Sequence, residues 1–268
     1  MASSFPQMNP QRIRSYILRL PLCTRLICIL IVAFWVAGIS HGFQNWASLA
    51  PEAVFSGSMH RLNTYPFLHL GLIHTLANLL ALTPLLERFE SEHGTLVTIV
   101  MFTGPFATFP AAIYLLIAYI FGIHTPILGA SIWVFLLLAS SIVQQSKTQP
   151  YIAPPAFLNL PQTYRIPTAA LPILIILLTS FLSTLHVIPA TSLLGHLAGA
   201  LIGYLWGLGY IKFLAPPEKV LRWIEAKLNL LGRIPHYVSV DQKVFGRYGI
   251  LPQTASVPVS SSSAIPMV

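Results

Sequence analysis

The chain has 268 residues, of which 55% are hydrophobic and only 8% are charged. A soluble domain carries roughly 25% charged residues, so this composition excludes a soluble enzyme and predicts an integral membrane protein. The formal net charge is +8 at pH 7. We attribute that charge to membrane topology, and we expect no nucleic-acid partner.

Apolar segments occur in six places, each long enough to be compared with the ~20 residues that a helix needs to cross a bilayer. Two long stretches without charge each hold two spans, because Gly122 and Pro126 interrupt the first and Pro189 interrupts the second. The sequence therefore predicts an all-α polytopic membrane protein with six helices. The predicted helices cover residues 22–41, 67–86, 95–120, 126–145, 169–187 and 190–211.

The first apolar segment follows four arginines between positions 12 and 25, which is typical of a signal peptide. Its apolar run is long and no clean cleavage site ends it, so we interpret it as a retained signal anchor. Cys23 and Cys28 lie at its cytosolic end, where no disulfide is expected.

The positions of the basic residues predict the orientation of the six helices. Fourteen of the fifteen Lys and Arg residues fall on one predicted side, and only Arg61 falls on the other. Basic residues concentrate on the cytosolic side of membrane proteins. We therefore expect both termini to be cytosolic.

The connections between helices also carry information. The luminal connection 41–66 is rich in apolar and aromatic residues, so we expect it to lie in the membrane interface. The cytosolic connection 148–167 is rich in proline and is predicted to be extended. A short basic helix, Glu218 to Leu231 with Trp223, could lie on the membrane surface.

The predicted regions are a basic N-terminus (1–21), a six-helix membrane domain (22–212), a basic tail (213–251) and a disordered C-terminus (252–268).

Polar residues interrupt three of the predicted helices. Helix 2 contains His74 and Asn78, helix 4 contains Ser131, and helix 6 contains His196. These three helices run in the same direction, and at 1.5 Å per residue the four side chains lie roughly 8–17 Å below their helix starts. Polar and ionisable residues at such depth are expensive to keep and mark functional sites by default.

Each of these residues also has a structural explanation. Ser131 can hydrogen-bond its own backbone, His74 and Asn78 can join neighbouring helices, and His196 can be a core histidine. The four residues at one depth favour a shared site over four separate explanations.

Glycines in helix 6 recur every fourth residue, at Gly195, Gly199, Gly203 and Gly207. A stripe of small residues lets another helix approach closely. We expect the stripe to bring His196 within hydrogen-bond distance of Ser131.

A serine-hydrolase triad has an acidic residue that orients the histidine. None of the seven acidic residues of this sequence is well placed for that role. If the site is hydrolytic, it must be a Ser–His dyad with Ser131 as nucleophile and His196 as general base. His74, Asn78 and the Ser131 N–H group would then donate hydrogen bonds to an oxyanion. We expect neither a metal ion nor a cofactor.

Three motifs together resemble the rhomboid intramembrane serine proteases: Gly129-Ala130-Ser131, His196-x-x-Gly199-x-x-x-Gly203 and His74-x-x-x-Asn78. Arg61 is similar to the arginine of the Trp-Arg element in the family's first luminal loop. The resemblance covers residues 20–212 and implies a six-helix rhomboid-like bundle. It also implies that Ser131, His196, His74 and Asn78 have the roles given above. The implied substrates are single-span membrane proteins, which enter sideways from the lipid and are cleaved near the luminal face.

The sequence departs from the family pattern at three positions. Ile132 stands where glycine usually follows the serine, and His60 stands where tryptophan usually precedes the arginine. Phe135 stands where many members have a tyrosine stacked on the histidine, so an aromatic face is kept. The Ala-Ser-Ile sequence most resembles fungal Golgi-type rhomboids and implies a membrane of the Golgi or the secretory pathway.

The main alternative is a catalytically silent, derlin-like protein that binds membrane clients in quality control or trafficking. Such relatives generally lack the Ser and His pair, so Ser131 and His196 favour the enzyme. A small transporter is disfavoured, because no inverted repeat and no intramembrane carboxylate are visible. The tail segment Phe245 to Leu251 resembles a short peptide that recruits an AAA ATPase, which makes such an ATPase a candidate partner.

Overall fold

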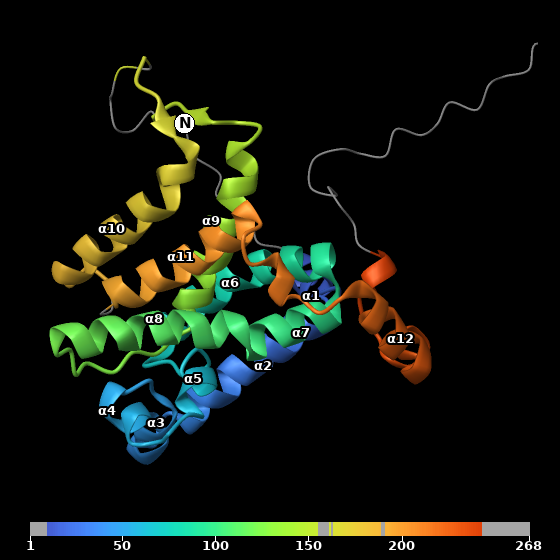
Figure 1. Cartoon of the computed structure of the whole chain (residues 1–268), viewed down its shortest axis with the longest axis horizontal. Coiled ribbons are helices and arrows are strands. Elements are labelled where there is room, and N and C mark those ends of the chain that lie inside the picture. Colours follow the sequence, from blue (N-terminus) through green and yellow to red (C-terminus); the bar gives the residue numbers. More distant parts are fainter. Residues whose placement is uncertain (1–9, 155–160, 162, 189–190, 243–268) are drawn as a thin grey trace, which may run out of the picture.

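The computed structural model describes residues 10–154, 161, 163–188 and 191–242, and most of these residues are helical (Figure 1). The larger helices overlap the six segments predicted from the sequence. They are α2 (Leu22–Ala37), α6 (Leu72–His93), α7 (Thr95–Thr103), α8 (Pro105–Phe121), α9 (Ser131–Ser146), α10 (Leu171–Thr184) and α11 (Leu193–Leu208).

The third predicted helix consists of two pieces, because α7 ends at Thr103 and Pro105 starts α8. Together they span Thr95–Phe121, the one helical segment among the described residues that is long and apolar enough to cross a membrane by itself. Helices α2 and α9 have 16 residues each, about 24 Å at 1.5 Å per residue, whereas the hydrocarbon core is about 30 Å thick. The count of six membrane spans therefore stays a prediction.

Three short helices replace the loop predicted between α2 and α6: α3 (His41–Ala47), α4 (Pro51–Phe55) and α5 (Arg61–Thr64). We call residues 38–71 the α3–α5 segment. Arg61 fastens it internally, because its guanidinium donates to the carbonyls of Ser48, at 2.7 Å, and Asn45. The His60 ring stacks on Trp46 with 4.6 Å between ring centroids.

Helices α9 and α11 are packed backbone to backbone. A Cβ added at Gly199 would overlap the carbonyl of Ile132, and one added at Gly203 would overlap that of Leu136. At Gly207 the added Cβ would lie 2.9 Å from the carbonyl oxygen of Ser140. These three glycines form the predicted close contact, whereas Gly195 faces Ser192 and Ile127 instead.

Glu90 organises the end of the molecule where α6 is followed by α7. Its buried carboxylate accepts hydrogen bonds from the backbone N–H groups of Cys23 and Thr24, at 2.9 and 2.7 Å. The hydroxyls of Thr24 and Thr95 also donate to it. The first N–H groups of a helix have no partner within the helix, so Glu90 caps α2 from a distant part of the chain.

The smaller elements lie around these helices. The predicted tail helix is present as α12, although a left-handed Asn229 separates it from α13. The connection predicted to be extended contains a short antiparallel strand pair. Bounds are α1 (Pro10–Ile17), β1 (Tyr151–Ile152), β2 (Ile166–Pro167), η2 (Thr168–Ala170), η3 (Lys212–Leu214), α12 (Glu218–Leu228), α13 (Leu230–Arg233) and η4 (Val240–Gln242). Pro189, Phe245 to Leu251 and residues 252–268 lie outside the described residues.

Candidate active site

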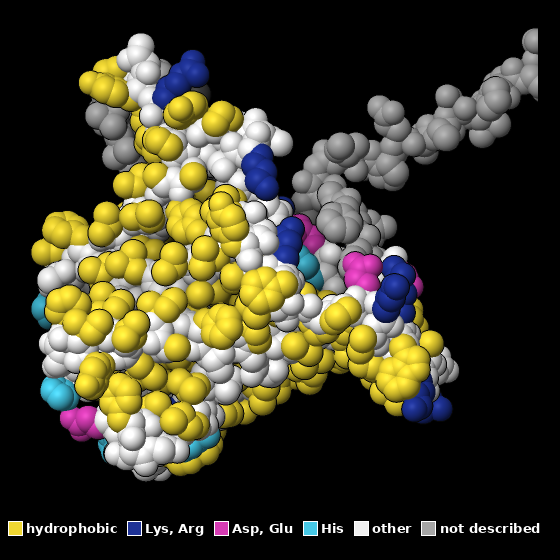
Figure 2. All heavy atoms as spheres, in the orientation of Figure 1, with side chains coloured by type: hydrophobic (Ala, Val, Ile, Leu, Met, Phe, Trp, Pro, Cys, Tyr) yellow, Lys and Arg dark blue, Asp and Glu magenta, His cyan; other side chains and the backbone are white. Residues whose placement is uncertain are grey.

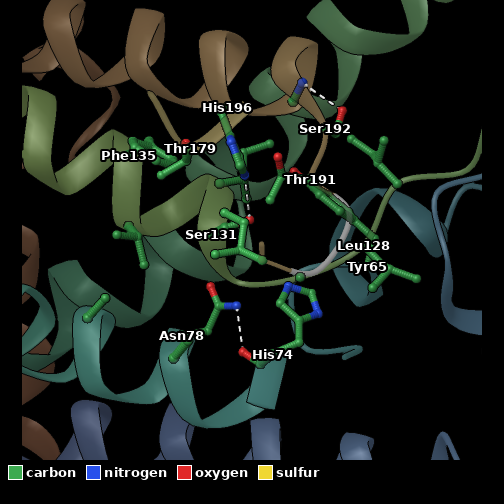
Figure 3. Close-up of a pocket in the computed structure, with 18 of the residues that line it drawn as sticks. Tyr65, His74, Asn78, Leu128, Ser131, Phe135, Thr179, Thr191, Ser192 and His196 are labelled. Carbon is green, nitrogen blue, oxygen red and sulfur yellow. Dashed lines mark hydrogen bonds between the residues drawn. The ribbon is translucent and has the colours of Figure 1, made fainter. Parts of the chain in front are cut away.

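Ser131 and His196 are in direct contact although 65 residues separate them in the sequence. Ser131 is the first residue of α9, and His196 is the fourth residue of α11. The distance between His196 Nε2 and Ser131 Oγ is 2.9 Å, within hydrogen-bond range (Figure 3). The imidazole is buried, with 4% of the residue exposed. The structure therefore brings together the two residues proposed from the sequence as nucleophile and base.

The prediction that helix 4 begins near residue 126 was wrong, because α9 begins at Ser131. Ile127 instead pairs with Leu49 through two backbone hydrogen bonds of 3.0 and 3.1 Å. Gly129 then turns the chain with a φ of +112°, a left-handed conformation that favours glycine. Ser131 consequently lies at the start of its helix and not more than a turn inside it.

Tyr65 holds the turn before Ser131 in place. Its carbonyl accepts a hydrogen bond of 2.9 Å from the Gly129 N–H group. Its hydroxyl donates to the carbonyl of Ala107 in α8, at 3.1 Å. The Tyr65 side chain is buried, so the turn is fastened to the α3–α5 segment and, through it, to α8.

His69 also positions the nucleophile, and the sequence analysis did not identify it. The Ala130 N–H group donates to His69 Nε2 at 3.1 Å, and His69 Nδ1 lies 2.9 Å from the carbonyl oxygen of Phe67. Because a carbonyl only accepts, Nδ1 carries the proton and Nε2 is the acceptor. The signal available in the sequence was a third histidine, five residues before His74.

The other nitrogen of His196, Nδ1, is buried, and no hydrogen bond to it is recorded within the part of the chain that the structure describes. Among the same residues, no Asp or Glu lines the cavity around it. The Phe135 ring lies beside the imidazole, with 4.4 Å between centroids and 42° between the planes. The described residues thus contain a pair of Ser and His, with an aromatic ring beside the imidazole and no carboxylate in contact with it.

His74 and Asn78 line the same cavity from α6, on the side of Ser131 opposite His196 (Figure 3). The His74 ring packs over Gly129, where an added Cβ would lie 3.0 Å from His74 Cε1. Asn78 Nδ2 donates to the His74 carbonyl at 2.9 Å. The amide carries a second N–H group, which can donate to an oxyanion while the bond to the His74 carbonyl is kept.

The N-terminus of α9 supplies a further donor. Ser131 is the first residue of the helix, and no hydrogen bond from its N–H group is recorded among the described residues. Free N–H groups at a helix start carry partial positive charge and bind anions. This group lies on the nucleophile itself, as an oxyanion site requires.

The cavity has a volume of about 310 Å³. Its remaining lining is largely apolar and includes Ile132, whose side chain packs against Gly199 of α11. The branched residue beside the nucleophile is therefore accommodated by a position without a side chain. No group of three or more His, Cys, Asp or Glu that could hold a metal ion is found within the described ranges.

Comparison with known proteins gives a consistent result. A family model described as "Rhomboid domain" matches residues 56–213. This range contains the four candidate site residues His74, Asn78, Ser131 and His196. The chain is similar to "Rhomboid-type serine protease B" of Aspergillus fumigatus, with 52% identity over 97% of this chain and 92% of that protein. It is similar to "Rhomboid-type serine protease 2" of Neurospora crassa, with 49% identity over 96% and 90%. A Saccharomyces cerevisiae protein of the same name is 31% identical over 80% and 78%.

Proposed function

The chain belongs to the rhomboid family and is a rhomboid-type serine protease of the membrane, and from that premise we propose that Ser131 and His196 are its catalytic dyad. The 2.9 Å contact between His196 Nε2 and Ser131 Oγ is the observation that supports this assignment. A hydroxyl becomes a useful nucleophile when a base in hydrogen-bond contact removes its proton.

In the first step, His196 Nε2 takes the proton from Ser131 Oγ while that oxygen attacks the carbonyl carbon of the substrate. The carbonyl oxygen becomes an oxyanion, which the Ser131 N–H group, His74 and Asn78 stabilise by donating hydrogen bonds. The peptide C–N bond then breaks, and His196 gives its proton to the leaving amine.

In the second step, His196 removes a proton from a water molecule, whose oxygen attacks the Ser131 ester. The C–O bond to Ser131 breaks, and the proton on His196 returns to the serine oxygen. The enzyme is then ready for another substrate, and the peptide leaves as an acid.

Phe135 performs part of the role that the carboxylate has in a triad, which is to orient the histidine and to stabilise its positive charge. The ring beside His196 restricts the orientation of the imidazole. Its π-system also attracts the positive charge that the imidazole gains during the reaction, a contribution of about 0.5–2 kcal/mol.

The proposed substrates are single-span membrane proteins that are cleaved near the luminal face. The cavity lies beside the first turns of α6, α9 and α11, the ends that the distribution of Lys and Arg assigns to the lumen if six spans cross the membrane with both termini cytosolic. A helical substrate must unwind to expose a peptide bond, so small or helix-breaking residues favour cleavage. The resemblance to fungal Golgi-type rhomboids supports a Golgi or other secretory-pathway membrane. The alternative of a silent, derlin-like protein gives no reason for the contact between Ser131 and His196.

The test is to reconstitute the wild type and Ser131→Ala in vesicles with a panel of transmembrane peptides. We expect the wild type alone to cleave a peptide and to react with a fluorophosphonate. Ser140→Ala is the matched control, because Ser140 lies on the same helix but does not line the cavity. If the wild type neither cleaves nor reacts above the Ser131→Ala level, the proposed function is wrong.

A further inference from the structure

The helix that follows α11 lies across it. The segment Lys212–Leu228, which contains η3 and α12, is turned by 92° from α11. If α11 crosses the bilayer along its normal, as the sequence predicts, a helix perpendicular to its end runs close to parallel with the bilayer surface. Residues 209–217 connect the two helices, so α12 is held near that surface.

The outward side of α12 exposes two apolar residues beside a lysine. Val220 and Trp223 are 48% and 60% exposed, and at 100° per residue they lie about 60° apart with Lys227 between them. Leu228, the last residue of the helix, is 51% exposed, whereas Leu221 is buried in the core. Trp and Leu beside basic residues are typical of helices that lie in the membrane interface.

The side of α12 opposite Trp223 is fastened to the protein by Glu225. Its buried carboxylate accepts hydrogen bonds from the Tyr237 hydroxyl, the Ser239 hydroxyl and the Val240 N–H group, at 2.7, 2.7 and 3.0 Å. Burial, together with the neighbouring carboxylate, raises the pKa of Tyr237, so this hydroxyl remains a donor. The contacts fix the rotation of the helix, and Trp223 stays directed outward.

Among the described residues, the charged side chains of α12 without a recorded ion pair are basic. Arg222 engages the acidic residues, with Glu218 at 3.3 Å and Asp241 at 2.8 Å. No ion pair is recorded for Lys219 or Lys227 within the described residues, and Lys227 Nζ lies 4.7 Å from the Trp223 ring centroid. Basic and hydrophobic side chains share the surface of this part of the molecule (Figure 2).

We propose that α12 is an interfacial helix that binds an anionic lipid surface, with Trp223 inserted among the headgroups and Lys219 and Lys227 in contact with their negative charge. The perpendicular orientation, the exposed Trp223 and the two lysines without a recorded ion pair all fit this partner. The proposal rests on the membrane location of the protein and is independent of the catalytic dyad.

The experiment measures the burial of Trp223 in lipid. The full chain is reconstituted in vesicles of phosphatidylcholine with brominated acyl chains, with and without phosphatidylserine. The contribution of Trp223 is the difference in fluorescence between the wild type and Trp223→Phe. We expect stronger quenching of this contribution in the vesicles that contain phosphatidylserine, and a loss of the difference at high ionic strength.

The lysines are tested with Lys219→Gln/Lys227→Gln. Each lysine near an anionic surface contributes about 1 kcal/mol, so the double variant should lower the lipid-bound fraction relative to the free fraction by about five-fold per lysine. The matched control is Lys147→Gln/Arg165→Gln, which removes the same charge between α9 and α10 and should change nothing. Absence of quenching in both vesicle types overturns the proposal and indicates a different partner. Equal quenching in vesicles with and without phosphatidylserine contradicts the proposed contact with lipid charge. Equal quenching in the double variant and the wild type contradicts it as well.

Discussion

Ile132 packs both its carbonyl and its side chain onto Gly199, where an added Cβ would lie 2.9 Å from Ile132 Cγ1. Ile132 directly follows Ser131, and Gly199 is three residues after His196, one turn along α11. The contact therefore sets the register between α9 and α11 at the level of the dyad. The close approach of the α9 and α11 backbones therefore determines the distance between Ser131 and His196.

Gly199→Ala should reduce activity more than it reduces folding. The added methyl group overlaps Ile132, and overpacking of this kind typically costs about 1–3 kcal/mol. The shift separates Ser131 from His196. Cleavage rates and thermal unfolding measured on the same preparation check this, with Gly42→Ala, where the nearest atom lies 3.7 Å away, as a control. Unchanged cleavage would show that the register tolerates the methyl group.

His196→Ala should abolish cleavage in a protein that remains folded. The loss should be at least about a thousand-fold in kcat, because the hydroxyl of Ser131 loses its base. The double variant Ser131→Ala/His196→Ala should be no worse than either single variant, since the two residues act as a unit. Single-turnover cleavage gives the comparison, and retained activity in His196→Ala would remove this residue from the dyad.

Asn78→Ala and His74→Ala should lower kcat with little change in KM. An oxyanion donor contributes about 10²–10³ to kcat, because its bond is strongest in the transition state. The Asn78 amide already donates to the His74 carbonyl and has a second N–H group for the oxyanion, so both variants should show an effect of this order. Steady-state kinetics separate the two parameters. A rise in KM alone would instead assign these side chains to substrate binding.

Gly129→Ala should impair the enzyme through its backbone. A φ of +112° is unfavourable for alanine, and the new Cβ would contact the His74 ring at 3.0 Å. Residues held in such conformations cost about 1–3 kcal/mol. We expect reduced reaction with fluorophosphonate and a lower unfolding temperature. The control is Gly57→Ala, another glycine with positive φ but with nothing within 4 Å of the added Cβ; equal loss in both variants would assign the effect to backbone strain alone.

Glu90→Gln should destabilise the fold without touching the site. An amide oxygen is a weaker acceptor than a carboxylate, and its NH₂ group faces the donors of Cys23, Thr24 and Thr95. Disrupting buried hydrogen bonds to a charged group costs about 1.5–3 kcal/mol each at most. Denaturant unfolding should show the loss, whereas kcat of the folded fraction should not change. Glu87→Gln is the comparison, because Glu87 is a half-buried carboxylate of the same helix that accepts a hydrogen bond from the Tyr16 hydroxyl.

The sequence was informative where the signal was local. Charge-free stretches located the large helices, and the glycines at 199, 203 and 207 predicted the contact between α9 and α11. Ser131, His196, His74 and Asn78 could be predicted to lie together, because three helices of the same direction place them at one level.

Features that depend on distant parts of the chain were missed. The start of α9 is delayed because Ile127 pairs with Leu49, a contact across almost eighty residues that no local pattern reveals. His69 could not be recognised as a positioning residue, because its partner is a backbone N–H group 61 residues away. The helices of the α3–α5 segment escaped for a similar reason, since they are short and are held by the bonds of Arg61 to backbone carbonyls.

Tyr65 uses its two polar groups in different directions, its carbonyl toward Gly129 and its hydroxyl toward Ala107. The side chain is buried, and the residue joins the α3–α5 segment both to the turn before Ser131 and to α8. A substitution anywhere in the α3–α5 segment can therefore misalign the reacting oxygen without touching the cavity. Variants of this segment are best analysed as changes to the catalytic geometry, even when the residue concerned is far from Ser131 and resembles part of a linker.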